Sequence, residues 1–278
     1  MGPPDPVIDV CQLLLRQTGR LVVFTHLPGQ GLIRPPLNVI RRPRADVTLA
    51  NQLPETDMLN MNFEERVVIN TNDQDWVPSP SGGVLRKPLA REEAERGHAT
   101  SVVRYEPGAS FSRHEHPLGE EILVLDGVFS DETGDYPAGT YLRNPPGSGH
   151  APFSREGCTL LVKLHQFDPR DLETVRVDTH KAPWLPGQGG LQVMPLHDFE
   201  HEHVALVKWP AGERFQPHRH FGGEEIFVLS GEFRDEYGHY PAGTWLRSPH
   251  MSQHHPFVEQ ETVIWVKTGH LPVAHSPS

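Results

Sequence analysis

Short runs of alternating or β-branched apolar residues recur through residues 63–271, separated by Gly, Pro and Asp. ATSVVRY (99–105) and TLLVKLHQF (159–167) are early examples, and ALVKW (205–209) and TVIWVKTG (262–269) are later ones. Runs of this length with turn residues between them predict short antiparallel strands. The pattern therefore predicts an all-β fold, either a sandwich or small barrels.

The pattern of strands and turns occurs twice. GVFSDETGDYPAGTYLRNPPGSGHAPF (127–153) aligns without a gap on GEFRDEYGHYPAGTWLRSPHMSQHHPF (231–257), with 17 of 27 positions identical. Two copies are too few for a solenoid, which needs at least three to bury its core. We therefore predict two tandem domains, residues 61–170 and 171–271, followed by a short tail, residues 272–278.

Residues 1–60 match neither copy and are rich in Arg and Pro. Two interpretations are open. The segment is either a disordered or loosely packed extension, or it precedes the natural start, since Met61 lies two residues before the first copy begins. We assign it no function.

Composition excludes several classes of protein. The formal net charge is −11, and nucleic-acid binding needs a basic surface. No apolar run approaches the ~20 residues of a membrane span. The only cysteines, Cys11 and Cys158, allow neither a disulfide framework nor a thiolate zinc site. We expect a cytoplasmic protein with a small-molecule ligand or substrate, and leave a homodimer open.

A polar cluster interrupts both copies. HEHPLGEE (114–121) returns as HRHFGGEE (218–225), 104 positions later. Two histidines one residue apart on a strand point to the same face and can share an ion. A glutamate follows after a short turn, and a further histidine lies downstream in each copy. The predicted metal ligands are His114, His116, Glu120 and His150 in the first copy and His218, His220, Glu224 and His254 in the second. Three imidazoles and a carboxylate suit Fe(II), Zn or Mn, one ion per domain.

Other polar residues have structural interpretations. Glu121 and Glu225 adjoin the predicted ligands and should point to the opposite face, outside the barrel, where they hydrogen-bond or pair with arginine. Arg143 and Arg247 could clamp a substrate carboxylate, but pairing with the repeated Asp-Glu of the preceding turn is favoured. HDFEHEH (197–203) has no counterpart in the first copy and is interpreted as a solvated loop.

The two clusters resemble the metal-binding motifs of the cupin superfamily. The first motif is matched by Gly108, His114, His116, Glu120 and Gly127, and again by Gly212, His218, His220, Glu224 and Gly231. The second is matched by Gly139, Pro145, Gly147 and His150, and partly by Gly243, Pro249 and His254. In the second copy Met251 stands in the glycine place, Val258 in the place usually held by Asn, and His255 beside His254.

More narrowly, SDETGDYPAGTYLRNPPGSGH (130–150) resembles the cupin domain of ChrR-type proteins. The resemblance implies two tandem cupin (double-stranded β-helix or jelly-roll) barrels, each with a metal inside. Some members carry an N-terminal anti-sigma module with His and Cys zinc ligands. Residues 1–60 hold only His26 and Cys11, so that role does not transfer.

Two functions remain open at this point. The resemblance implies an Fe(II)-type dioxygenase cleaving small diketones or hydroxyketones. The alternative is a non-catalytic module that senses a metal or oxidant, or binds a ligand, and acts through a protein partner. Fold alone does not choose between enzyme and sensor. The departures at Met251 and Val258 make the second copy the candidate for a structural role.

Overall fold

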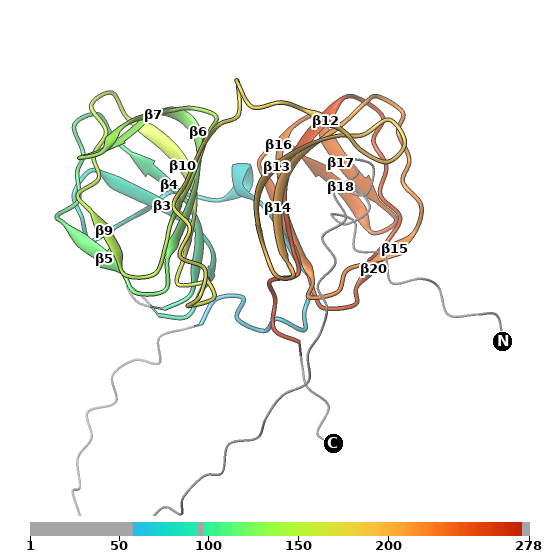
Figure 1. Cartoon of the computed structure of the whole chain (residues 1–278), viewed down its shortest axis with the longest axis horizontal. Coiled ribbons are helices and arrows are strands. Elements are labelled where there is room, and N and C mark those ends of the chain that lie inside the picture. The colour runs from blue at the N-terminus through green and yellow to red at the C-terminus, as the bar shows by residue number, and fades with distance from the viewer. Residues whose placement is uncertain (1–57, 94–96, 274–278) are drawn as a thin grey trace, which may run out of the picture.

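The computed structural model describes residues 58–93 and 97–273. Within them the secondary structure consists of β-strands and one short 3-10 helix, η2 (Thr71–Asp73). Figure 1 shows two barrels side by side, with their large sheets facing each other. The predicted all-β class and the two tandem barrels are confirmed. Nearly all of the N-terminal segment, and the last five residues of the tail, lie outside the described residues.

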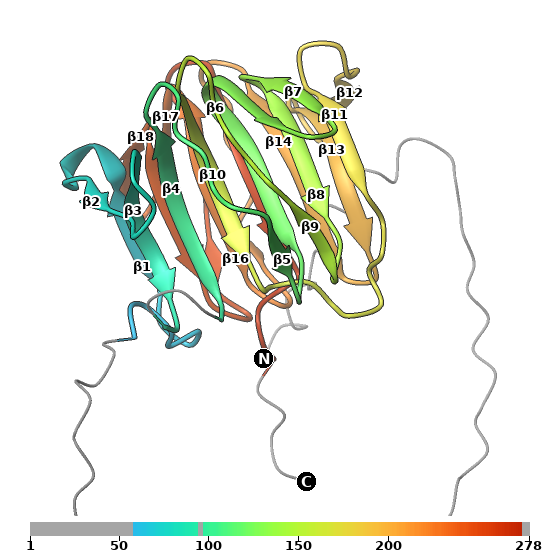
Figure 2. The ribbon, with the colours of Figure 1, turned by 90° about the vertical axis from the view of Figure 1, so that its left-hand side faces the viewer.

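The first barrel is built on an antiparallel sheet with the strand order β11-β8-β6-β10-β4-β3-β2. A second, two-stranded sheet joins β5 to β9, and β7 pairs with the far half of β6. The strands are β2 (Val77–Pro78), β3 (Val84–Arg91), β4 (Ala99–Tyr105), β5 (His114–His116), β6 (Glu120–Asp131), β7 (Gly134–Pro137), β8 (Thr140–Asn144), β9 (Ser148–His150), β10 (Cys158–Leu164) and β11 (Val175–Asp178). Figure 2 looks onto this barrel, with strands of the second barrel behind it.

The second barrel repeats the plan with the order β1-β19-β16-β21-β14-β13-β12. Two-stranded sheets again complete it, β15 with β20 and β17 with β18. The strands are β1 (Val67–Asn70), β12 (Leu185–Pro186), β13 (Gln192–Phe199), β14 (Glu202–Trp209), β15 (His218–Arg219), β16 (Glu224–Ser230), β17 (Glu232–Asp235), β18 (Gly238–Pro241), β19 (Thr244–Ser248), β20 (Gln253–His254) and β21 (Thr262–Thr268).

The barrels exchange their first strands. β1 begins the first repeat but pairs with β19 of the second barrel, Val67 opposite Arg247. β11 begins the second repeat but pairs with β8 of the first barrel, Val175 opposite Arg143. Each large sheet is therefore completed by the other repeat, and the barrels are linked by backbone hydrogen bonds as well as by packing.

Within the described residues, three apolar clusters make up the core. One fills the first barrel around Phe129 and Leu142, and another fills the second around Phe233 and Leu246. The third lies between the large sheets and includes Trp245, Trp265 and Tyr141 at 0–1% exposure. Alternation along each strand explains why apolar residues cluster both inside each barrel and between the barrels. Successive side chains face first the barrel interior and then the neighbouring barrel. Burial of these aromatic rings joins the barrels into one unit.

Buried charges cross the interface between the barrels. Lys163 Nζ lies 2.6 Å from Glu225 Oε2, and Lys267 Nζ lies 2.7 Å from Glu121 Oε2. Both glutamates face out of their own barrel, as predicted from strand alternation. Their closest cationic partners, however, are lysines of the opposite barrel. Arginine is a weaker partner, since Arg143 Nη1 lies 3.5 Å from Glu121.

The expected pairing of Arg143 and Arg247 with the Asp-Glu turns is wrong. Arg143 binds Asp171 at 2.6 Å and Glu202 at 2.8 Å. Arg247 donates to the main-chain oxygens of Asn60 and Asn62. The contacts of both arginines are therefore with segments outside the turns that precede them. Neither reaches the metal side, so neither is placed to clamp a substrate there.

The interpretation of residues 197–203 as a solvated loop is also wrong. The segment forms the ends of β13 and β14, which pair directly. His197 is buried and lies 2.8 Å from Asp171, and His203 is buried and lies 2.6 Å from Asp198. Aspartate partners allow His197 and His203 to be buried, while Asp198, Glu200 and His201 of the same hairpin are exposed.

Candidate metal centre

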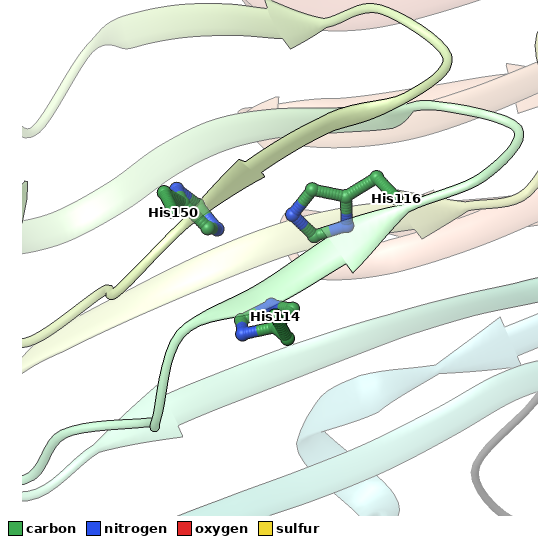
Figure 3. A group of neighbouring side chains, drawn as sticks. All are labelled: His114, His116 and His150. Carbon is green, nitrogen blue, oxygen red and sulfur yellow. The ribbon is translucent and has the colours of Figure 1, made fainter.

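The first histidine cluster is assembled by the pairing of β5 with β9. His114 lies directly opposite His150 in the register, and His116 follows two residues later on the same face of β5. One ring nitrogen from each of the three histidines lies within 4.8 Å of the others. Figure 3 shows the rings close together.

Glu120 brings a carboxylate to the same place. Its Oε2 lies 3.4 Å from Nε2 of both His116 and His150. Asn144, on the neighbouring β8, donates a hydrogen bond of 2.8 Å to that oxygen. Glu120 is the first residue of β6, so the three-residue turn after His116 folds the chain back onto the histidine pair.

The histidine rings are held with Nε2 directed into the cluster. His114 Nδ1 lies 2.9 Å from the Ser112 carbonyl, and His150 Nδ1 lies 3.2 Å from Asp131 Oδ2. A neutral imidazole that donates from Nδ1 keeps its Nε2 lone pair free to bind a metal. The Asp131 partner was not predicted, although its repetition at Asp235 was the available signal.

Burial leaves these nitrogens in need of a partner. Among the described atoms, Nε2 of His116 and of His150 is buried and has no hydrogen-bond partner. Burial lowers the pKa of His116 to about 4, so the ring is neutral at pH 7. Unprotonated imidazole nitrogens beside a buried carboxylate fit a divalent cation.

The second cluster has the same plan in a tighter form. His254 Nε2 lies 3.0 Å from His220 Nε2 and 3.2 Å from His218 Nε2. Nitrogens that share one ion at about 2.0–2.1 Å must lie roughly this far apart. Glu224 Oε2 lies 3.5 Å from His220 and 3.7 Å from His254. These residues too could hold a cation.

Electrostatics in the second cluster also favour neutral rings. Burial lowers the pKa of His218 to about 3 and the pKa of His220 well below its usual value. His218 Nδ1 lies 2.9 Å from the Gln216 carbonyl. A buried Glu224 among neutral rings has its pKa raised by burial, and a bound cation would reverse that direction.

The departures from the motif in this copy do not disturb the cluster. Met251 adopts a φ of +61°, close to the +79° of Gly147 at the equivalent position. His254 joins the other two histidines, whereas His255 is exposed and its backbone N–H donates to Glu236. Of the two adjacent histidines, His254 is the one whose ring lies with His218 and His220, so the prediction of His254 as a ligand is kept.

Comparison with known proteins bears on both clusters. The model of the ChrR cupin-like domain matches residues 64–168 and again residues 172–272. The chain belongs to the ChrR cupin-like family. No curated protein matches the sequence.

Solved structures with the same fold are distant in sequence. A candidate dioxygenase from Nostoc punctiforme has a TM-score of 0.63 at 15% identity, covering 77% of this chain and 88% of its own. YlbA from Escherichia coli has a TM-score of 0.61 at 12% identity, and the match covers 77% of this chain and 94% of YlbA. An oxalate decarboxylase OxdC variant from Bacillus subtilis has a TM-score of 0.53 at 15% identity, and the match covers 74% of this chain and 78% of that protein. These likenesses support the fold of the ChrR cupin-like chain.

The two ChrR cupin-like barrels differ in the space beside their clusters. The first contains a cavity of about 410 Å³ lined by His114, His116 and Glu120. In the second, the corresponding cavity is about 30 Å³. Aromatic and aliphatic side chains line the smaller cavity, including Trp209, Phe215 and Phe233. The first barrel thus has room for a small organic molecule, and the second has room for about one water.

His165 is a cavity residue that sequence reasoning missed. It lines the first cavity and has a φ of +58°, in the left-handed region where side chains are strained. The equivalent position in the second barrel is Gly269, where an added Cβ would lie 1.7 Å from the His201 carbonyl oxygen. The second barrel therefore has no space for a histidine side chain at this position, whereas the first barrel has. The strained backbone of His165 is of the kind found at functional sites.

No helix in the described part of the chain is long and apolar enough to span a membrane.

Proposed function

We propose that this ChrR cupin-like protein is a metal-dependent dioxygenase of small diketone- or hydroxyketone-like compounds, with its reaction in the first barrel. The cavity of about 410 Å³ beside His116 and Glu120 carries this proposal. Its counterpart of about 30 Å³ leaves no room for such a compound. The second barrel would hold its metal in a structural role.

The residues of the first barrel would each have a definite task. His114, His116, His150 and Glu120 would hold the ion. A bound Fe(II) would polarise a chelated enolate and supply electrons to O2. Asn144 fixes the Glu120 carboxylate, and Ser112 and Asp131 fix the tautomers of His114 and His150.

The apolar walls of the cavity would exclude bulk water from the reaction. Ile122, Phe129 and Val162 line it, while Tyr105 supplies a phenol whose pKa burial raises well above its usual value. A phenol in that state stays protonated and can donate a hydrogen bond to a substrate oxygen. Among similar structures, the names dioxygenase and oxalate decarboxylase support an enzyme over a passive binding module.

Matched variants in the two barrels test the proposal. Oxygen uptake is measured on Fe(II)-loaded full-length protein with acetylacetone and with acetoin, for wild type, His116→Ala and His220→Ala. We expect turnover to fall by at least about 100-fold in His116→Ala, because a ligand is lost. We expect His220→Ala to keep most of it.

Two results would contradict the proposal. Equal loss in both variants would show that the first barrel is not the separate reaction site. Tightly held zinc with no oxygen uptake from any Fe(II)-loaded preparation would favour the sensing module that acts through a protein partner.

A further inference from the structure

His165 lies at the first cavity because the backbone at this residue breaks the alternation of β10. Val162 and Leu164 of that strand line the cavity, whereas Lys163 faces the second barrel and pairs with Glu225. Continued alternation would point residue 165 toward the second barrel as well. Its left-handed backbone, with a φ of +58°, ends the strand pattern and places His165 among the residues that line the cavity.

The turn itself does not call for a histidine. The residue after the last strand has a left-handed backbone in both barrels, with a φ of +58° at His165 and +77° at Gly269. Glycine adopts this conformation without strain, whereas a residue with a side chain does not. The first repeat thus has a strained histidine where glycine would serve the fold, and it has it beside the larger of the two cavities.

His165 also lies next to the metal cluster. Its backbone N–H donates a 3.0 Å hydrogen bond to the carbonyl of Gly119, and the preceding Leu164 lies opposite Glu120 in the sheet register. The imidazole is near enough to His116 to act on it electrostatically. Burial is the main reason why the pKa of His116 is lowered, and the charge of His165 is one of the smaller causes. A small molecule held at the cluster would therefore lie beside the imidazole of His165.

The ring nitrogens of His165 are available for chemistry. Within the described part of the chain, the imidazole of His165 forms no hydrogen bond or ion pair with another residue. Imidazole gains and loses a proton near neutral pH, and in its neutral form one nitrogen accepts a proton while the other carries one. A ring in this state beside a ligand cavity can move a proton to or from a bound molecule.

The other charged or titratable groups of the cavity are less suited to that task. Three are guanidinium groups, which keep their protons, those of Arg86, Arg91 and Arg113. The Tyr105 phenol also stays protonated, because burial raises its pKa well above the usual value. Glu115 is exposed and lies between two predicted ligands on β5, so its side chain points away from the cluster. The remaining groups are the predicted metal ligands themselves.

We propose that His165 is the proton-transfer residue of the first barrel, and that it takes a proton from the carbon beside a substrate carbonyl. The C–H bond breaks, its electron pair stays on the substrate as an enolate, and the proton forms an N–H bond on the imidazole. The negative charge of the enolate suits a divalent cation held by the histidines and Glu120. This assignment deepens the proposed function and rests on it, since it assumes a ketone bound at the ion.

Exchange of a carbon-bound proton for deuterium tests the assignment without any reaction of oxygen. Zinc-loaded full-length protein in D2O is mixed with acetoin, and NMR follows the loss of the proton on the hydroxyl-bearing carbon. We expect wild type to accelerate this exchange. His165→Asn should slow the protein-catalysed exchange by at least about 100-fold, as expected when a general base is lost. Asparagine tolerates a left-handed backbone, so the variant should fold as wild type does.

His165→Gly separates a chemical role from a structural one. Glycine is the residue that the second barrel has at this position, and the missing ring leaves space in the cavity. Added imidazole should restore exchange in this variant in proportion to its concentration and leave the wild-type rate unchanged. The control is His180→Asn, which should keep the wild-type rate, because His180 is exposed and its ring lies 3.0 Å from the Ala138 carbonyl instead of lining this cavity.

Zinc content is measured in every sample, so that the two proposals can fail separately. Undiminished exchange in His165→Asn would overturn the assignment of His165, and so would a His165→Gly protein that imidazole does not restore. Wild type that binds zinc without accelerating exchange would also overturn this assignment alone. Wild type without bound zinc would overturn the proposed function and this assignment with it.

Discussion

Lys163 of the first barrel and Glu225 of the second form an ion pair of 2.6 Å, and both side chains are 1% exposed. Lys267 and Glu121 form the equivalent pair with the barrels reversed, at 2.7 Å. Each glutamate directly follows a predicted metal ligand. Strands β6 and β16 therefore each give one glutamate to a metal cluster and the next glutamate to the contact between the barrels.

Breaking one of these pairs should destabilise the whole molecule. Lys163→Met leaves the Glu225 carboxylate buried without its lysine, with His270 at 3.1 Å and Trp245 at 3.2 Å as hydrogen-bond donors. We expect the free energy of unfolding to fall by about 3–5 kcal/mol, measured by urea denaturation. Lys163→Met combined with Glu225→Leu should recover much of the loss, because no buried charge is then left unpaired. A Lys163→Met protein as stable as wild type would contradict this prediction.

The aspartates behind the third histidine of each cluster should control metal affinity. Asp131 Oδ2 lies 3.2 Å from His150 Nδ1, and Asp235 Oδ2 lies 3.7 Å from His254 Nδ1. Asp131→Asn should weaken metal binding at the first site by about 10- to 100-fold. Competition with a chelator measures the dissociation constant. Asp235→Asn, the matched variant, should affect the second site alone. An unchanged metal dissociation constant at the first site in Asp131→Asn would contradict the role of Asp131 in metal binding.

The segment around β1, which the first repeat contributes to the second barrel, should stabilise the second metal site. Arg66, just before β1, lies 3.0 Å from Asp235 and donates a 2.7 Å hydrogen bond to Tyr240. Arg66→Met removes both contacts, and we expect weaker metal binding at the second site with the first unchanged. Chelator competition again provides the measurement. Equal weakening at both sites would point to a general loss of structure instead.

Acid should destabilise the protein partly through His98. Burial, with Lys163 adding to it, lowers the pKa of His98 to about 3. The unfolded chain takes up the proton near pH 6.5, so this contribution to stability is present above pH 6.5 and declines as pH falls toward 3. At pH 5 the loss should reach about 2 kcal/mol.

Denaturant unfolding of wild type and His98→Phe at several pH values between 7.5 and 4.5 measures that contribution. Phenylalanine keeps a ring against Phe63, which packs edge-on to His98, and removes the titrating group. The variant should lose less stability than wild type on acidification. Parallel pH profiles for the two proteins would contradict the assignment.

The repeated motifs allowed much of this structure to be predicted. Strand alternation and the HxH spacing give the all-β class and place His114 and His116 on one face, and the duplication gives two barrels. Strand exchange could not be predicted, because residues 65–71 and 173–179 resemble each other and either would fit either sheet. Local sequence carries no information on which of two similar edges a strand joins.

Polar residues far apart in the sequence were harder to interpret. Arg143 was assigned to the nearby Asp-Glu turn, but its partners Asp171 and Glu202 belong to the second repeat. His197 looked solvated because buried histidine is rare unless it is paired, and its partner Asp171 lies 26 residues away. The small cavity of the second barrel is lined by residues from several strands, among them Trp209 and Phe233, which only the folded sheet brings together.

Metal analysis of the purified protein tests whether each barrel holds its own ion. We predict about two equivalents of divalent metal per chain in wild type, and about one in each of His114→Ala and His218→Ala, since each barrel provides a separate ligand set. Wild-type protein prepared without chelator that holds no metal, or variants that keep two equivalents, would contradict it.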